Sequence, residues 1–596
     1  EEQGLRPALA IGLQDFAGTG VYSGEYIVAT KSFGRAGGLR LSAGIGWGRF
    51  GTANVIAGDE GTRVTEFRET GGTVNFDQFF TGPVGAFGGL AWDVTDRLSV
   101  KAEYSSDAYV QEEAAGLIEV DSPWNVGLDY ALGEGTRLGA SWLHGTTLGV
   151  QLTFTLNPTA PPFGPGVETA PLPVVGRPPR AAAPLGWSAA WIEAPAAREA
   201  ASGTLAERLA AEGILLEEVS LSGTRAEARV RNTRWGATAQ ALGRTVRVMS
   251  AVLPPAVEVF AVTFLQDGVP AARHEIARSE VERLENAAGA ATVARVRSTG
   301  GTGPLPPDAL RLQAYPDLAW RLSPYLEWSF FDPDQPVRAN AGLRLAGDLR
   351  LARGLVASGS ITQPIVGNLD EITREPNEGA LPIVRSDFAS YVDDLDPSLD
   401  RLTLAHFGRP SDVLFSRVTA GYLERMYAGV SGELLWKPVD SRLALGVELN
   451  HVQKRDPDDI FGLEDYDVTM GHVSAYYDIG NGYFGQVDVG RYLAGDDGAT
   501  FTLERVFDNG WRVGAYATFT DVPFEEFGEG SFDKGVLLTV PLQWLSGRPT
   551  RASVSTAIRS LTADGGARLN VADRLYDRAR AADRPGLEDR AGRFWK

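Results

Sequence analysis

The stretch L-R-L-S-A-G-I-G-W, residues 39–47, places apolar side chains at every second position and small or polar ones between them. A period of two is that of a β-strand, whose successive side chains point to opposite faces of a sheet. The same alternation recurs in segments that begin at Leu98, Leu148, Leu443, Trp511 and Val536. Repeated strands with one apolar and one polar face are typical of outer-membrane β-barrels, because lipid requires an apolar exterior and closure of the sheet satisfies the backbone.

The composition narrows the class of protein. The chain has 596 residues, a net charge of -20 and a pI near 4.9, which argues against nucleic acid as a partner. It contains no run of about 18 apolar residues, so the sequence excludes a membrane-spanning helix. A barrel remains compatible with the mean hydropathy of -0.12, because its lumen face is polar. Cysteine is absent, which excludes disulfides and thiolate sites.

Changes in composition divide the chain into six segments. The fold class that we predict is mainly β, with two antiparallel barrels and a small α+β domain between them. The segments are a first β-barrel at 1–156, a proline-rich linker at 157–186, a small soluble α+β domain at 187–290, a Gly/Pro linker at 291–309, a second β-barrel at 310–545 and a charged, partly helical tail at 546–596. The chain opens with E-E-Q-G-L-R-P and no signal peptide, so we expect a mature or truncated start.

The segment 187–290 has the pattern αββ-αββ-α, which suggests an internal duplication. The string T-L-A-E at 204–207 matches a capping box for the first helix, which Gly213 would end. A second helix is predicted over about 236–251. The string S-E-V-E at 279–282 matches a cap for a third helix.

Seven unusual strings carry a resemblance. They are D-F-A-G-T-G-V-Y-S-G-E-Y (15–26), S-P-W-N-V-G-L-D-Y (122–130), V-T-A-G-Y-L-E-R-M-Y-A-G-V-S-G-E-L-L-W (418–436), M-G-H-V-S-A-Y-Y (470–477), G-R-Y-L-A-G-D-D-G-A-T (490–500), R-V-F-D-N-G-W-R-V-G-A (505–515) and F-G-E-G-S-F-D-K-G (527–535). Together they resemble the YjbH/GfcD family of outer-membrane proteins, which are encoded with Gram-negative exopolysaccharide and capsule systems. The resemblance implies a cell outer membrane location, two β-barrels with the periplasmic α+β domain at 187–290 between them, and a part in polysaccharide secretion or export. Members of the family usually have further strands ahead of the D-F-A-G-T-G region, so the resemblance also implies that the first barrel at 1–156 lacks its N-terminal strands. The partners that it implies are polysaccharide, outer-membrane lipid and other exopolysaccharide secretion proteins.

Polar and aromatic residues of the second barrel are candidates for contact with a sugar. Charged side chains on neighbouring strands predict a network of ion pairs in the lumen, which would brace the wall or contact substrate. Aromatic side chains beside them would stack on sugar rings, although a register error of one residue moves any of them to the lipid face. The candidates are Tyr422, Glu424, Arg425, Glu433, Trp436, Tyr476, Arg491, Tyr492 and Asp496.

Two alternatives to a secretion protein stay open. The first is a polysaccharide hydrolase or modifying enzyme that uses the acidic cluster Glu525, Glu526, Glu529 and Asp533 beside Lys534, if two carboxylates lie about 5 to 9.5 Å apart. Glycines on both sides of Glu529 favour a solvated turn instead. The second is a soluble secreted glycan-binding β protein. The five histidines are widely spread and no HExxH motif occurs, so we expect no metal site. The sequence also has no Gly-X-Ser-X-Gly motif and no Gly-rich phosphate loop ahead of a helix, and we expect no cofactor and no enzymatic activity.

Overall fold

The computed structural model describes most of the chain. The described residues are 2, 6–15, 22–34, 38–58, 76–155, 157–161, 168–307, 309–312, 314–330, 337–372, 376, 381–392, 395–523, 532–559 and 564–596. They form two compact units, the first ending at Ala160 and the second beginning at Pro161. Among the described residues, none of the helices has both the length and the apolar character needed to cross a membrane.

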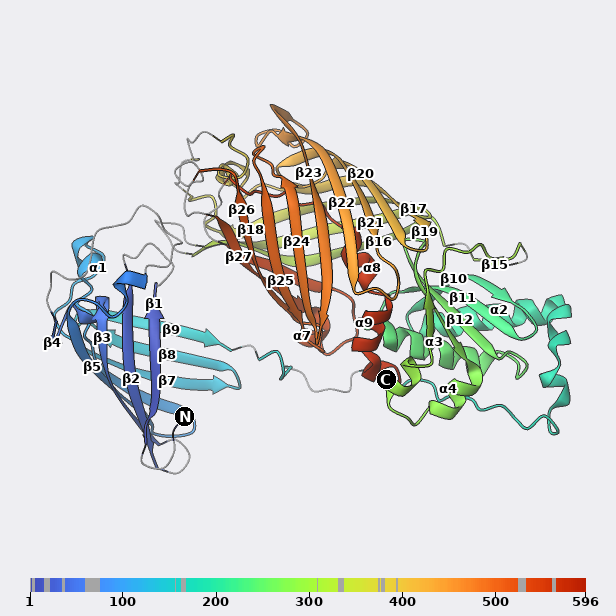
Figure 1. The fold of residues 1–596 in the computed structure, drawn as a ribbon, viewed down its shortest axis with the longest axis horizontal. Coiled ribbons are helices and arrows are strands. Elements are labelled where there is room, and N and C mark those ends of the chain that lie inside the picture. The colour runs from blue at the N-terminus through green and yellow to red at the C-terminus, as the bar shows by residue number, and fades with distance from the viewer. Residues whose placement is uncertain are drawn as a thin grey trace. The chain divides into compact units, whose positions relative to one another are not determined.

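The first unit is one antiparallel sheet of nine strands, in the order β1-β2-β3-β5-β6-β7-β8-β9 with β4 on β5 (Figure 1). The stretch at 39–47 lies in β3, which pairs with β2 along its whole length. No pairing of β1 with β9 occurs within the described residues, so a closed first barrel stays a prediction. The strands are β1 (Ala8–Gln14), β2 (Gly24–Phe33), β3 (Leu39–Gly48), β4 (Val55–Ala57), β5 (Val84–Asp93), β6 (Leu98–Tyr104), β7 (Trp124–Gly133), β8 (Thr136–Leu143) and β9 (Thr147–Phe154), and helix α1 is Val110–Ala114.

The second unit contains an α+β part with a six-stranded sheet, in the order β14-β13-β12-β11-β10-β15. Strands β11 and β12 are parallel because helix α3 connects them as a crossover, whereas the other pairs are antiparallel. The elements from α2 to α4 follow the predicted αββ-αββ-α order. They are α2 (Pro195–Ala211), β10 (Ile214–Leu221), β11 (Arg225–Asn232), α3 (Thr238–Val252), β12 (Val259–Gln266), β13 (Val269–Ala277), α4 (Arg278–Leu284), α5 (Gly289–Val293), β14 (Arg297–Thr299) and β15 (Leu310–Arg311).

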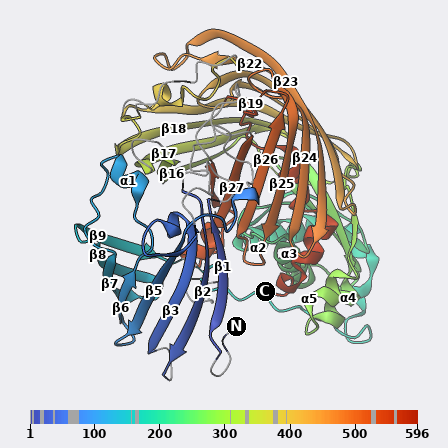
Figure 2. The same cartoon turned by 60° about the vertical axis from the view of Figure 1, so that its left-hand side comes forward.

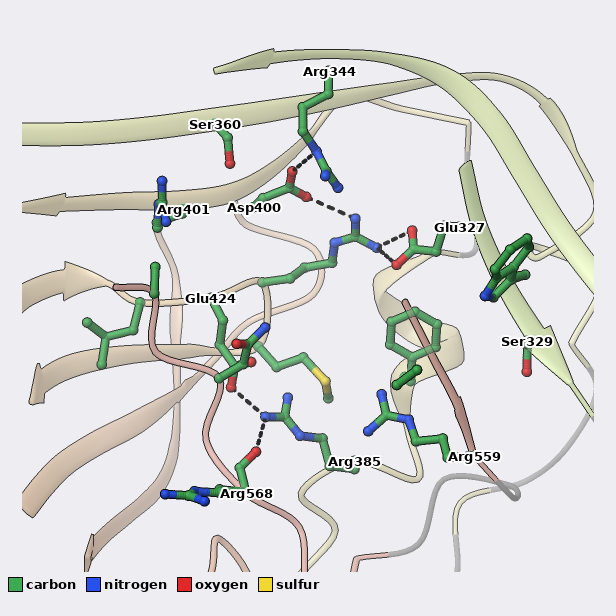
Figure 3. Close-up of a pocket in the computed structure, with 18 of the residues that line it drawn as sticks. Glu327, Ser329, Arg344, Ser360, Arg385, Asp400, Arg401, Glu424, Arg559 and Arg568 are labelled. Atoms are coloured by element: carbon green, nitrogen blue, oxygen red, sulfur yellow. Dashed lines mark hydrogen bonds and ion pairs between the residues drawn. The ribbon is translucent and has the colours of Figure 1, made fainter. Parts of the chain in front are cut away.

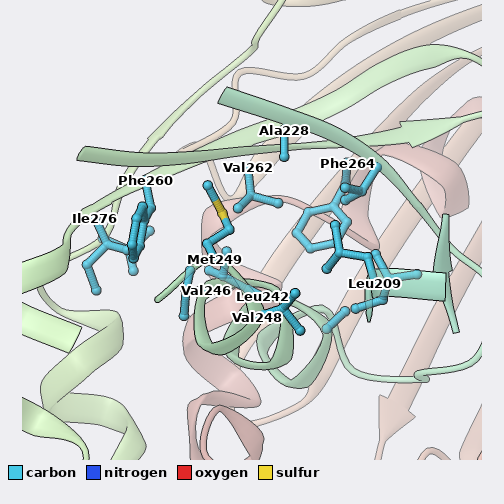
Figure 4. Close-up of a cluster of buried hydrophobic side chains, with 14 of the residues drawn as sticks. Leu209, Ala228, Leu242, Val246, Val248, Met249, Phe260, Val262, Phe264 and Ile276 are labelled. Carbon is cyan, nitrogen blue, oxygen red and sulfur yellow. The ribbon is translucent and has the colours of Figure 1, made fainter. Parts of the chain in front are cut away.

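Helix α3 and the sheet enclose the core of the α+β part. Leu242, Val246 and Met249 of the helix are fully buried against the sheet, where Val262 and Phe264 face them (Figure 4). Burial of each such side chain contributes about 1.5–3 kcal/mol. The apolar face of this helix therefore holds the domain together.

Two predicted helix caps are wrong. Helix α2 begins at Pro195, where the missing N–H costs nothing, so the string at 204–207 lies inside the helix. Helix α4 begins at Arg278, and the hydroxyl of Ser279 donates to Glu258 (2.6 Å) rather than capping the helix. The predicted end of α2 is correct, because Gly213 follows it with a φ of 74°.

Both predicted linkers contain packed residues. In the proline-rich linker, Leu172 and Val174 pack against the core of the α+β part. Arg177 pairs with Glu282 of α4 (3.0 Å). In the Gly/Pro linker, β14 (Arg297–Thr299) pairs with β13. Proline and glycine therefore marked irregular backbone in these segments, but not the absence of packing.

Strands β16–β28 form a nearly closed antiparallel barrel of thirteen strands, each paired with the next in sequence (Figures 1 and 2). Between the two end strands, Trp328 Nε1 of β16 donates to Thr556 Oγ1 of β28 (2.9 Å). The mainly β class is confirmed. The strands are β16 (Asp317–Phe330), β17 (Val337–Ala352), β18 (Leu355–Gly367), β19 (Ser398–Ser411), β20 (Leu414–Tyr422), β21 (Tyr427–Trp436), β22 (Leu443–Arg455), β23 (Leu463–Gly480), β24 (Tyr483–Arg491), β25 (Asp497–Val506), β26 (Arg512–Thr520), β27 (Asp533–Pro541) and β28 (Ser553–Arg559).

Side-chain exposure in the barrel alternates in the sense opposite to that of a water-soluble sheet. In β22, Val447 and Leu449 are 54% and 62% exposed, whereas Glu448 and Asn450 are 4% and 1% exposed. The same order holds in β20, where Val418 is exposed and Arg417 is buried. The outer face of the barrel is therefore apolar and its inner face polar.

The C-terminal segment, residues 564–596, is packed and is not a free tail. The predicted barrel boundary at 545 is also too early, because β28 (Ser553–Arg559) pairs with β27. The segment contains α8 (Leu575–Arg580) and α9 (Arg584–Asp589), shown in red in Figure 1. Leu575 is buried with residues of the inner face of the barrel, and Phe594 is buried in the core of the α+β part. The segment thus links these two parts of the second unit.

The two ends of the barrel differ in their connections. At the turn end, three connections are two-residue turns, at 353–354, 412–413 and 481–482, and the other three cover 437–442, 507–511 and 542–552. This end faces the α+β part, since Gly354 N donates to Asp267 O (2.6 Å). At the opposite, loop end, the longest connection joins β18 to β19 and covers 368–397.

Candidate functional site

The inner face of the barrel carries a buried network of ion pairs. Arg417 of β20 lies between two carboxylates, with Nε 3.1 Å from Glu433 and Nη2 3.3 Å from Glu448. Arg574 of the C-terminal segment also pairs with Glu448 (2.8 Å). Such buried charges are tolerated only where they are paired and hydrogen-bonded, so this network fixes the segment against the wall.

Aromatic packing continues this attachment. The ring of Tyr576 stacks on that of Tyr476 with centroids 4.0 Å apart. The backbone N–H of Leu575 donates to the carboxylate of Glu433 (3.1 Å). These contacts place α8 on the inner face of β21 and β23, where it occupies part of the lumen.

The turn between β24 and β25 holds the other end of the segment. Asp496 accepts a hydrogen bond from Gly566 N (2.7 Å), and burial raises the pKa of its carboxyl group. The neighbouring Tyr492 is buried, with its hydroxyl 2.6 Å from Thr500 Oγ1. The C-terminal segment therefore runs inside the barrel from the loop end toward the turn end.

A cavity of about 640 Å³, here called the lumen cavity, lies beside this segment. Its wall comes from strands β16–β19 and β28, from the turn after β20 and from the C-terminal segment (Figure 3). The charged residues in its lining are Arg321, Glu327, Arg344, Arg385, Asp400, Arg401, Glu424, Arg425, Arg559 and Arg568. The lining is thus rich in hydrogen-bond donors.

Ion pairs fix the middle of the lumen cavity. Arg425 is 3.0 Å from both Glu327 and Asp400, and Arg344 is 3.2 Å from Asp400. A dashed line in Figure 3 marks the pair of Arg344 and Asp400. Burial acts to lower the pKa of Arg425, but these carboxylates outweigh it and raise that pKa above its ordinary value. The guanidinium groups stay charged at any physiological pH.

A second ion pair lies deeper, between Arg385 and Glu424 (2.6 Å). Burial acts to lower the pKa of Arg385, and the carboxylate of Glu424 outweighs this and raises it. Arg385 Nη2 also donates to the carbonyl oxygen of Arg568 (3.1 Å). The cavity wall is therefore preorganised by contacts between a barrel turn, a loop and the C-terminal segment.

The nine sequence candidates lie in different places. The cavity brings together only Glu424 and Arg425, while Glu433, Tyr476, Tyr492 and Asp496 hold or neighbour the C-terminal segment. The charged candidates do not form ion pairs with one another in the described structure. Their partners are Arg385 for Glu424, Glu327 and Asp400 for Arg425, Arg417 for Glu433 and Asp497 for Arg491.

The remaining three candidates lie away from both the lumen cavity and the C-terminal segment. Tyr422 donates its hydroxyl to Phe461 O (3.0 Å) in a loop-end turn. Arg491 pairs with Asp497 (3.0 Å), and both side chains are about half exposed. Trp436 follows the outward alternation of β21 and is exposed.

Of the predicted acidic cluster, only Asp533 and the neighbouring Lys534 lie within the described residues. Glu525, Glu526 and Glu529 lie outside them. Asp533 begins β27 and accepts a weak hydrogen bond from the Tyr516 hydroxyl (3.4 Å), while Lys534 lies over the Phe532 ring. Within the part of the chain that the structure describes, no three His, Asp or Glu side chains are grouped as metal ligands would be.

Sequence reasoning named Arg425 but missed the other six arginines of the lumen cavity. A signal was present in the strands, where Arg321 and Arg344 alternate with apolar neighbours that face outward. No such signal existed for Arg385 and Arg568, which come from irregular segments. Only the folded chain brings them to the cavity.

Two comparisons with known proteins, one with a family model and one with a curated relative, show the same family. The family model YjbH, described as exopolysaccharide biosynthesis protein YbjH, matches residues 1–581. The chain is 30% identical over 602 residues to the uncharacterized lipoprotein YjbH of Escherichia coli (strain K12), a match that covers 97% of this chain and 82% of that protein. Among solved structures, Salmonella typhi OmpF in complex with daunomycin matches with a TM-score of 0.23 and 11% identity, over 37% of this chain and 85% of that chain. The family match extends over both compact units.

Proposed function

The chain belongs to the YjbH exopolysaccharide biosynthesis family, and we propose that it is an outer-membrane β-barrel protein that assists the secretion of an exopolysaccharide or capsule. Its role is passive and not enzymatic. The lumen holds a hydrated glycan by hydrogen bonds and charge, while the α+β part docks other secretion proteins. This role needs no cofactor.

The exposed apolar outer face of the barrel carries the membrane part of the proposal. Residues such as Val447, Leu449 and Val473 are more than half exposed, on the face opposite to buried charges such as Glu448. A belt of this kind is costly in water and favourable in lipid. The lipoprotein relative in Escherichia coli supports an envelope location as well.

The connections between strands support an orientation. Outer-membrane barrels have short periplasmic turns and longer extracellular loops. The turn end of this barrel faces the α+β part, with Arg350 paired to Asp267 (2.7 Å) across the junction. We therefore place the α+β part in the periplasm and the loop end at the cell surface.

Density fractionation of membranes tests the location. The full-length protein should separate with outer-membrane markers and require detergent for extraction. A protein that stays soluble without detergent would support the secreted glycan-binding alternative and refute the barrel in lipid.

Complementation tests the role in secretion. Deletion of the gene should reduce polymer at the cell surface, and the full-length protein should restore it. Purified protein should leave the chain length of the polymer unchanged, whereas shortening of the polymer would favour the hydrolase alternative.

A further inference from the structure

The lumen cavity has a strong excess of positive charge. Seven arginines and only three carboxylates line it, in a chain whose net charge is -20. The carboxylates are Glu327, Asp400 and Glu424, and each is already paired with an arginine (Figure 3). The charge of the lining is therefore opposite in sign to that of the whole chain.

Three arginines of the cavity have no ion pair within the described residues. They are Arg321 of β16, Arg401 of β19 and Arg559 of β28, whereas Arg568 pairs with Asp488 (2.8 Å). Nε of Arg401 is buried and has no hydrogen-bond partner among the described atoms. Three strands thus present guanidinium groups to the same space, where the one nearby carboxylate without an arginine ion pair of its own is Asp533, which lies beside Arg559 in the described part of the barrel.

A second cavity of about 300 Å³ extends this surface. Arg385, Arg559 and Arg568 line both cavities, and Arg574 is added in the second. Thr500, Thr502 and Thr518 contribute hydroxyl groups to its wall. The two cavities therefore form one surface with cationic groups and hydroxyls interleaved.

We propose that this surface binds the carboxylate groups of an acidic polysaccharide, such as one built from uronic acids. The planar guanidinium fork matches a carboxylate in two hydrogen bonds, and rings of arginine in a pore select anions. Arg401 is partly buried and its Nε has no partner among the described atoms, so an anion would relieve the cost of burying this charge. Arg321 and Arg559 are exposed in the lumen and add positive charge beside it, which favours the charged polymer over a neutral one. This inference rests on the proposed function and specifies its substrate class.

Calorimetric titration of the full-length protein in detergent tests the proposal. The probes are a galacturonic acid hexamer and maltohexaose, which have the same length and differ in charge. We expect binding of the galacturonate at least tenfold tighter than that of maltohexaose, and weaker binding as NaCl is raised. Equal affinity for the two hexamers would overturn the proposal without any need for a variant.

Substitutions locate the binding. The variant Arg321→Gln/Arg401→Gln/Arg559→Gln should lose at least tenfold in galacturonate affinity, and Arg401→Gln alone should lose part of it. The matched control is Arg548→Gln, which removes the same charge from an exposed position outside both cavities. Galacturonate binding that survives in the triple variant, or that falls equally in the control, would refute the assignment to the lumen cavity.

The two proposals fail in different ways. If deletion of the gene leaves surface polymer unchanged while the purified protein still prefers galacturonate, the secretion role is wrong and the binding site stands. If deletion abolishes surface polymer but neither hexamer is preferred, the secretion role stands and the acidic substrate class is wrong.

Discussion

Substitution of Gly243 by alanine should release the C-terminal segment from the α+β part. Gly243 lies inside helix α3, and a Cβ built there would overlap the carbonyl oxygen of Phe594 and lie 2.8 Å from its carbonyl carbon. Backbone cannot move aside as a flexible side chain can. The clash therefore forces residues around Phe594 off the helix.

The sign of the effect is opposite to that expected from helix propensity. Alanine in place of glycine in a helix contributes about 1 kcal/mol of stability. Loss of the buried Phe594 side chain from its site costs about 3 kcal/mol. We therefore expect a net loss of about 2 kcal/mol in the free energy that holds the segment in place.

Limited trypsin digestion measures the release, because Arg590 and Arg593 lie in the segment. Cleavage there should become faster in Gly243→Ala, and hydrogen exchange over 582–596 should rise. The matched control is Gly203→Ala in helix α2, where a Cβ would meet no atom within 4 Å. The reasoning is refuted if Gly243→Ala gains stability like the control and keeps its resistance to trypsin.

Three further predictions concern the barrel and the pH response. Arg417→Ala should lower the stability of the barrel by about 3–5 kcal/mol because it leaves buried carboxylates unpaired, whereas Arg491→Ala, which removes an exposed ion pair, should lower it by under about 1 kcal/mol. The temperature at which the barrel loses SDS resistance measures both effects, and equal shifts in the two variants would contradict the burial argument. Leu449→Arg on the outer face should reduce the free energy of folding into lipid vesicles by about 2–4 kcal/mol, and with it the folding yield, while Thr502→Arg in the second cavity should fold normally. Similar yields for the two variants would show that the outer face does not meet lipid. Burial lowers the pKa of His274 in the folded protein to about 4. Below about pH 6.5 this histidine takes up a proton in the unfolded chain but not in the folded protein. The free energy of unfolding is therefore highest above about pH 6.5 and falls by about 3 kcal/mol as the pH drops to about 4. Urea midpoints at these two pH values measure the loss, and it should shrink in His274→Gln; an unchanged pH dependence would assign it to other groups.

The sequence predicted the barrel because its strands obey a simple rule. In β22, the apolar residues from Leu443 to Leu449 alternate with residues that prove to be buried inside, so a period of two was sufficient. The α+β elements were also predictable, since Gly213 ends a helix and short strands follow in pairs. Helix starts were less so, because a four-residue capping pattern also occurs inside a helix.

The C-terminal segment was not predictable from its charge pattern. Its arginines and aspartates resemble a solvated helix, yet Asp583 pairs with Lys437 (2.7 Å) and Arg580 with Glu504 (3.0 Å). These partners are distant in sequence and lie on the inner face of the barrel. A polar segment is expected to be exposed to solvent only where its surroundings are water. Inside a polar lumen, the same charged residues are buried and paired.

The candidate site was predicted in part for the same reason. Glu424 and Arg425 line the lumen cavity, and their contact with a sugar stays a prediction. Their partners Arg385, Glu327 and Asp400 come from other strands and loops. Alternation assigns a residue to a face and does not say which residues meet across a closed sheet.

The route of the C-terminal segment sets an order of assembly. His274 of β13 donates from Nε2 to the carbonyl oxygen of Ala582 (3.1 Å), a residue made 308 positions later. The α+β part thus emerges early in synthesis but stays unfinished until the barrel strands have followed and the segment has been threaded between them. The core of the α+β part is therefore complete only once the barrel has formed, and a barrel that fails to close leaves that core open.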